Sequence, residues 1–185
     1  MSRTPTSRAP RLAAAALPLA LAALAAPASA QRSSDDAGAY VIRLGNDTIA
    51  VETFTRTADR LQGRMVVRTP STQVRDYTTT LAPDGTVTRF ETAVRGPADA
   101  QPTTRSVIEF GADSATIRVT RGDSTQTFRV AAARGSIPLV NLSVALYGPA
   151  IARAAGADST VLSLVPAGRT TPPRAVIRRA GNGAF

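Results

Sequence analysis

The 185-residue chain has no cysteine, no histidine and no lysine, so every basic residue is an arginine. Within these residues, the absences exclude a Ser-His-Asp triad, a cysteine nucleophile, the usual zinc sites and haem ligation by histidine. Schiff-base chemistry is excluded as well, because it needs a lysine amine. Carboxylates, hydroxyls and arginine remain, and we expect neither a metal nor a cofactor.

Two further scarcities limit the fold and the partners. Without cysteine there is no disulfide framework, so stability must come from the core. Aromatic residues make up 4% of the chain, and arginines are interspersed with acids through most of it despite a net charge of +9. Because nucleic-acid binding needs a basic patch with aromatic platforms, we expect no nucleic-acid partner. Contact with an anionic lipid or polysaccharide stays open.

Residues 1–30 have the pattern of a secretory signal peptide. Three arginines precede an apolar, alanine-rich run over residues 12–26, which is too short to span a membrane. Ala28 and Ala30 occupy positions −3 and −1 of a cleavage site before Gln31. We expect an exported protein, periplasmic or extracellular, with no membrane span after cleavage. An uncleaved anchor is the alternative.

Residues 31–39 are small and polar, and we interpret them as a flexible lead-in. From Tyr40 onward the chain alternates with period two, which is typical of half-buried strands. In residues 49–52 this alternation predicts that Ile49 and Val51 point inward. Turn signals such as Pro83-Asp84-Gly85 recur at intervals of roughly 8–12 residues. These connections are too short for helical crossovers, so we predict seven or eight strands in an antiparallel meander and no parallel sheet.

The alternation stops at residues 137–158, the most apolar segment after the signal peptide. Its alanines favour helix, and Pro149 suits the first turn of a short one. Two further strands are predicted at 159–165 and 174–179. Residues 181–183 form a turn motif with two residues after it, so the chain is either a fragment or has a frayed end. The predicted fold is one mainly β domain over 40–185, a curved sheet or half-barrel with one short apolar helical segment packed on it.

The three glutamates, Glu52, Glu91 and Glu109, could supply paired carboxylates for glycoside hydrolysis. Each lies within a predicted strand with an arginine nearby in the sequence. Cross-strand ion pairs on a solvated face explain them better, and each such pair contributes well under ~1 kcal/mol. We therefore predict no catalytic residues.

Two non-enzymatic functions remain. The first is binding of an apolar envelope ligand, such as a lipid or acyl chain, in the hollow of the sheet. The second is a structural or assembly module of the cell envelope without a small ligand. The sequence indicates neither the ligand nor the oligomeric state. For any single candidate, ordinary core packing is the better explanation. The candidate ligand-lining residues are Met65, Phe90, Phe110, Phe128, Leu142 and Leu146.

The architecture resembles the lipoprotein-carrier-like half-barrel envelope domains of bacteria. The points of likeness are the signal peptide, the runs "DTIAVETFTRTADRLQGRMVVRT" and "TTTLAPDGTVTRFETAV", and the apolar helical segment near the sheet. The resemblance implies an antiparallel sheet over a lipid-sized cavity with helices as a lid. The chain lacks that family's longer N-terminal helix, and no diagnostic motif is present.

Overall fold

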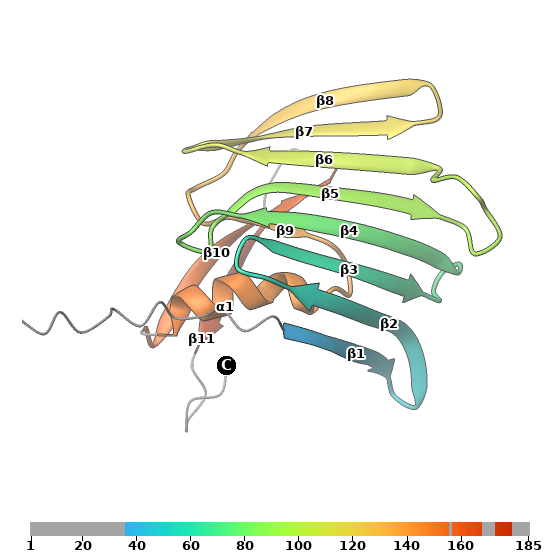
Figure 1. The fold of residues 1–185 in the computed structure, drawn as a ribbon, viewed down its shortest axis with the longest axis horizontal. Helices are drawn as coiled ribbons and strands as arrows, with labels where there is room; N and C mark the ends of the chain where they lie inside the picture. Colours follow the sequence, from blue (N-terminus) through green and yellow to red (C-terminus); the bar gives the residue numbers. More distant parts are fainter. Residues whose placement is uncertain (1–35, 156, 168–172, 179–185) are drawn as a thin grey trace, which may run out of the picture. The chain divides into compact units, whose positions relative to one another are not determined.

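The computed structural model describes residues 36–155, 157–167 and 173–178. The larger part of the fold is an eight-stranded antiparallel sheet in which each strand pairs with the next along the chain (Figure 1). The sheet is open: β1 and β8 form its two edges, and it is neither closed nor strongly curled. Its strands are β1 (Asp36–Leu44), β2 (Asp47–Arg56), β3 (Arg60–Val67), β4 (Gln73–Leu81), β5 (Val87–Arg95), β6 (Thr104–Phe110), β7 (Ser114–Arg121) and β8 (Ser124–Ala131).

Tight turns explain why consecutive strands pair. Gly45, Gly85 and Gly122 adopt positive φ in the β1–β2, β4–β5 and β7–β8 turns, a backbone region that glycine enters without steric cost. In the second turn, the Asp84 carboxylate accepts hydrogen bonds from the Thr86 amide and hydroxyl. The predicted antiparallel meander is therefore confirmed.

The predicted lead-in overlaps the first strand. Residues 36–39 belong to β1 and pair with residues 53–56 of β2. Gly38 crosses the ring of Phe54 so closely that a Cβ there would lie 2.8 Å from two of the ring carbons. The ring of Tyr40 stacks on the same ring, with 5.5 Å between the two ring centroids. The small residues that resembled a flexible segment thus allow β1 to approach an aromatic ring.

The predicted orientation of β2 is wrong. Ala50 and Glu52 are buried, whereas Val51 is 38% exposed. The register shifts between Ile42 and Arg43, leaving Ile49 opposite no residue of β1. Such a bulge breaks the simple alternation, so the sequence pattern before it does not fix which face lies inside.

The C-terminal layer consists of β9 (Ile137–Leu139), the 3₁₀ helix η1 (Ala145–Tyr147), α1 (Gly148–Ala154), β10 (Ser159–Pro166) and β11 (Arg174–Arg178). The three strands form a separate sheet in the order β11–β10–β9. Figure 1 shows β10 and β11 crossing behind the strands of the larger sheet. β9 and β10 pair in parallel, contrary to prediction, because the helical segment between them is long enough for a crossover.

The C-terminal layer packs on one side of the large sheet, here called the inner face, and this confirms the expected position of residues 137–158. Ala145 and Leu146 join the main cluster with Phe90, Ile108 and Ile117. A second cluster combines turn-flanking residues of β4 and β5 with Ile137 and Ala150. The opposite side of the sheet is called the outer face.

Two predicted features lie outside the described residues: the signal peptide and the turn at 181–183. Within the described ranges, no helix has the length and hydropathy needed to cross a membrane.

Candidate functional site

The six residues predicted to line a ligand site lie in or against the core. Phe90 and Leu146 are buried in the main cluster, and Phe128 packs against it. Phe110 contacts both this cluster and the second one. Met65 belongs to a third cluster, against which Leu142 packs. Neither of the two hollows described below is lined by any of the six.

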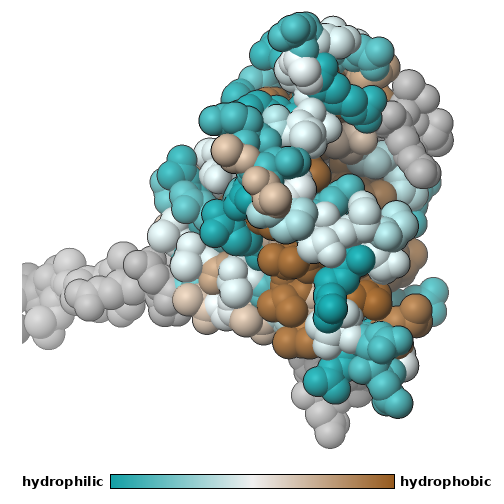
Figure 2. Space-filling view, turned by 90° about the vertical axis from the view of Figure 1, so that its right-hand side faces the viewer, coloured by the Kyte–Doolittle hydropathy of each residue, from teal (hydrophilic) through white to brown (hydrophobic). Residues whose placement is uncertain are grey.

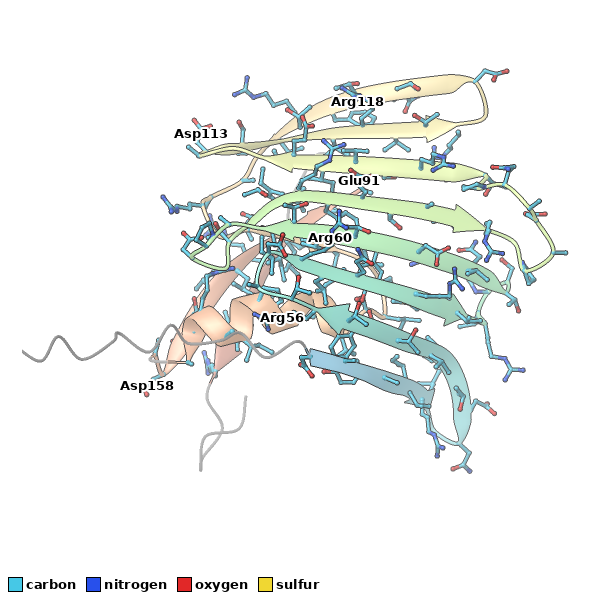
Figure 3. The ribbon with its side chains drawn as sticks, viewed as in Figure 1. Arg56, Arg60, Glu91, Asp113, Arg118 and Asp158 are labelled. Carbon is cyan, nitrogen blue, oxygen red and sulfur yellow. The ribbon has the colours of Figure 1, made fainter. Side chains whose placement is uncertain are left out.

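Glu91 and Glu109 lie on the outer face, where both form ion pairs with Arg89. Glu91 is 2.6 Å from the guanidinium, and all three side chains are substantially exposed. Figure 3 labels Glu91 and Arg118, which extend from the same outer row of the sheet. The predicted cross-strand ion pair is confirmed for Glu109, whereas Glu91 pairs with an arginine of its own strand, β5.

Glu52 behaves differently: its side chain is completely buried on the inner face. Oε1 accepts hydrogen bonds from the Tyr77 hydroxyl at 2.7 Å and the Ser143 hydroxyl at 2.5 Å. Oε2 accepts from the backbone amides of Val144 and Ala145, at 2.7 and 3.0 Å. The predicted pairing with Arg56 is absent from the described residues, and four donors satisfy the carboxylate instead.

These contacts make Glu52 an anchor for the C-terminal layer. The two backbone amides belong to the start of η1, where amides have no partner within the helix. The Glu52 carboxylate on β2 accepts their hydrogen bonds instead. Burial, and secondly the hydrogen bond to Glu52, raises the pKa of Tyr77 above its usual range. No oxygen of the carboxylate is left to act on a substrate. The sequence offered one weak signal: Glu52 lies two residues from Ala50 and two from Phe54, so period-two alternation places it on the same face as these two apolar residues.

A second anchor lies at the far end of the same helical segment. Arg153 of α1 donates to the carbonyl of Gly85 at 2.6 Å and to that of Gly135 at 2.8 Å. Burial lowers the pKa of this arginine. The segment from Ser143 to Arg153 is therefore held at both ends, at the sheet by Glu52 and at the β4–β5 turn by Arg153.

Between the inner face and the C-terminal layer lies a groove of about 510 Å³. This volume falls within the range of small-molecule sites. The sheet supplies its floor from two adjacent inner rows: Arg75, Val94, Thr104 and Arg121, and Thr92, Ser106 and Val119. The layer supplies its roof: Leu139, Val140, Asn141, Pro166 and Ala167.

Arg75 is the half-buried charge in the groove. Its Nη1 donates to the Asn141 carbonyl at 3.4 Å and its Nη2 to the Gln73 side chain at 3.3 Å, both long hydrogen bonds. Nε is buried and has no partner. Within the described ranges, no carboxylate comes within ion-pair distance of this guanidinium. Burial lowers the pKa of Arg75, as expected for a charge that is removed from water without a counter-ion.

A second hollow, of about 630 Å³, lies on the outer face. Most of its lining residues are polar in type, although their exposed surface is largely apolar. They include Arg64 and Asp76, which pair with each other at 2.6 Å. Threonines, Gln62 and Glu91 make up nearly half of the remaining lining, and Phe54, Tyr77, Ala93 and Val107 are among the rest. This outer hollow is more open than the groove and its central charges are already paired, so it offers less to a charged ligand than the groove does.

Apolar side chains also reach the surface near the β1 edge. Val41, Val51 and Val66 face one another across β1, β2 and β3 and are each more than a third exposed. Figure 2 views the molecule from the right-hand side of Figure 1. Apolar side chains gather in its lower half, at the height where Figure 1 draws β1 to β3. The valine row adjoins an edge strand whose outer side is unpaired in the described structure.

The fold is thus an open antiparallel meander covered on one face by an anchored C-terminal layer. No family model matches the chain, and neither a curated protein nor a solved structure is significantly similar to it.

Proposed function

We propose that the protein is a non-catalytic, exported binding protein that holds an apolar or amphipathic ligand in the groove. The observation that carries this proposal is the groove's position and lining. Half of its lining residues are apolar, among them Val94, Val119 and Val140, and half are polar. Such a mixed wall suits an amphipathic ligand, which has both a polar and an apolar part.

The two anchors support the proposal because they fix the roof. Asn141 lies two residues before Ser143, which is bound to Glu52. The backbone there is also constrained, since Leu142 has φ +69°. Outliers of this kind persist only where the surroundings hold them. A roof held in this way gives a groove formed before the ligand arrives, which lowers the entropic cost of binding.

Export remains part of the proposal and rests on the pattern of residues 1–30. The resemblance to lipoprotein-carrier-like envelope domains also remains a proposal. It agrees with the short helix packed beside the sheet.

The alternative, a structural or assembly module, is favoured by the valine row beside β1. An exposed edge strand flanked by apolar side chains is a template for strand addition by another chain. That surface does not involve the groove, so the two functions are separable by mutation.

Binding of the neutral fluorophore N-phenyl-1-naphthylamine, to protein purified after expression of the full 185-residue chain, tests the proposal. Val94→Trp fills the groove from its floor, whereas Val107→Trp is the matched change on the neighbouring strand, in the outer hollow. We expect V94W to weaken binding about tenfold or more, a loss of ~1.4 kcal/mol, and V107W to leave it nearly unchanged. Equal binding by wild type and V94W would overturn the assignment.

A further inference from the structure

We propose that the groove selects an anionic amphiphile, with an oxyanion head group on Arg75 and a single apolar chain along the valines beside it. This inference rests on the proposed function and specifies its ligand class. The head group is a carboxylate or a phosphate, as in a free fatty acid or a lipid phosphate.

The first step is the state of the Arg75 guanidinium. A guanidinium has five N–H donors in a planar fork that matches two oxygens of a carboxylate or phosphate. Arg75 uses two of them, both in long bonds to neutral acceptors. A charge removed from water without a counter-ion is costly, so an anion entering the groove would gain charge-assisted hydrogen bonds that the protein leaves unmade.

The second step is what lies beside Arg75. Val94 is its cross-strand partner on β5, and Thr104 and Arg121 follow in the same inner row on β6 and β7. With neighbouring strands about 4.8 Å apart, Arg75 and Arg121 lie roughly 14 Å from each other across the sheet. The roof over this interval includes Leu139 and Val140. The groove thus runs from the half-buried charge of Arg75 along Val94, Val119, Leu139 and Val140, which lie among the hydroxyls of Thr92, Thr104 and Ser106. An amphiphile with its charged group on Arg75 would lay its chain on these apolar side chains.

The two arginines have different roles. Arg75 is half-buried and in contact with the roof through Asn141. Arg121 is exposed, at the start of the β7–β8 turn. An exposed cation attracts anions from a distance, and dissolved salt screens this attraction. It contributes little to the affinity of the complex once the ligand is bound. We therefore assign the head group to Arg75 and electrostatic attraction to Arg121.

The outer hollow does not offer the same site. Its Arg64 is paired with Asp76 at 2.6 Å, so the charge is already compensated. Arg105, also in that hollow, is exposed to solvent and therefore hydrated. An anion that binds Arg105 would lose hydrogen bonds to water and gain an exposed ion pair, and the net gain in binding free energy would be small.

Displacement of N-phenyl-1-naphthylamine by four compounds of equal chain length tests the inference, at concentrations below micelle formation. The compounds are dodecanoate, dodecyl phosphate, dodecanol and dodecyltrimethylammonium. We expect at least one of the anions to displace the fluorophore about tenfold more strongly than dodecanol and the cation. The ranking of the two anions distinguishes a fatty acid from a lipid phosphate.

Arg75→Met keeps an apolar stem of similar length and removes the donors. We expect R75M to abolish the preference for anions while it still binds dodecanol, and Arg105→Met, in the outer hollow, to leave the preference intact. R121M should weaken anion binding only at low salt. Circular dichroism of each variant confirms folding, and the wild-type comparison holds even where a variant fails to fold.

The outcomes separate the two proposals. If dodecanol displaces the fluorophore as well as the anions do, the groove binds apolar ligands and the anionic head group is overturned. If R75M retains the anion preference, the assignment to Arg75 is overturned. If wild type and V94W bind the fluorophore equally, the proposed function fails, and this inference fails with it. If V94W weakens fluorophore binding but none of the four compounds displaces the fluorophore, this inference alone is overturned.

Discussion

The hydroxyl of Ser143 donates a 2.5 Å hydrogen bond to the buried carboxylate of Glu52, which lies 91 positions earlier in the chain. This contact joins the second strand of the meander to the start of the C-terminal helical segment. The same carboxylate receives the amides of Val144 and Ala145. The sheet and the layer that covers it are therefore connected through one side chain, and removing it should affect the whole protein.

Replacing Glu52 with methionine should lower the free energy of unfolding by more than about 3 kcal/mol, because two buried hydroxyls and two amides lose their acceptor. Glu52→Gln should cost less, since the Tyr77 and Ser143 hydroxyls can accept from the new amide. Glu91→Gln, which breaks an exposed ion pair, is the matched control and should cost under ~1 kcal/mol. Urea unfolding measures all three. A cost for E52M no larger than that for E91Q would contradict the anchor.

Tyr77 should make the protein sensitive to alkali. Its pKa is raised by burial and by Glu52, so the native state keeps a proton that the unfolded chain loses near pH 10. Stability is full below that pH and should fall above it by about 1.4 kcal/mol per pH unit. Urea unfolding between pH 9 and 11 should show a shallower pH dependence for Tyr77→Phe than for the wild type. An identical slope in Y77F would assign the loss to another group.

Gly63 leaves room for the Tyr77 ring. A Cβ at Gly63 would lie 2.2 Å from the ring's Cζ and hydroxyl oxygen, so Gly63→Ala must displace the side chain that binds Glu52. We expect a loss of about 1–3 kcal/mol. Gly148 is helical, and its nearest neighbour would be 3.8 Å from a new Cβ. Gly148→Ala should therefore be neutral or stabilising. Thermal unfolding in which both variants behave alike would contradict this account of Gly63.

Arg153 should contribute more to the free energy of unfolding than Arg134, an arginine with an exposed side chain. Arg153→Met removes two charge-assisted hydrogen bonds to the Gly85 and Gly135 carbonyls, with an expected cost of about 1.5–3 kcal/mol. Arg134 pairs with Asp84, and its side chain is 79% exposed. Arg134→Met should cost under ~1 kcal/mol. Urea unfolding compares them, and equal costs would show that the contacts of Arg153 do not hold α1 in place.

Much of the fold could be predicted because its signals are local. The period-two alternation and the glycine-containing turns specify where strands end, and the eight strands follow from them. The apolar run of 137–158 likewise predicted a segment that packs on the apolar face of the sheet, because both surfaces are then removed from water. Its helix and the two later strands appear within two residues of their expected positions.

The anchor and the groove could not be predicted because they depend on long-range pairing. The bulge at Ile49 inverts the orientation of β2, which turned Glu52 from an expected surface residue into a buried acceptor. Arg75 resembles any other strand arginine in sequence. Its environment arises only when Asn141, 66 positions away, closes over it. The parallel pairing of β9 with β10 brings Pro166 beside Leu139 and completes the roof.

The most direct test of the central claim is a crystal structure of the protein with dodecanoate. We expect the carboxylate within hydrogen-bond distance of the Arg75 guanidinium and the chain between Val94 and Val140. Dodecanoate bound in the outer hollow near Arg64, or a groove left empty in crystals saturated with the ligand, would contradict it.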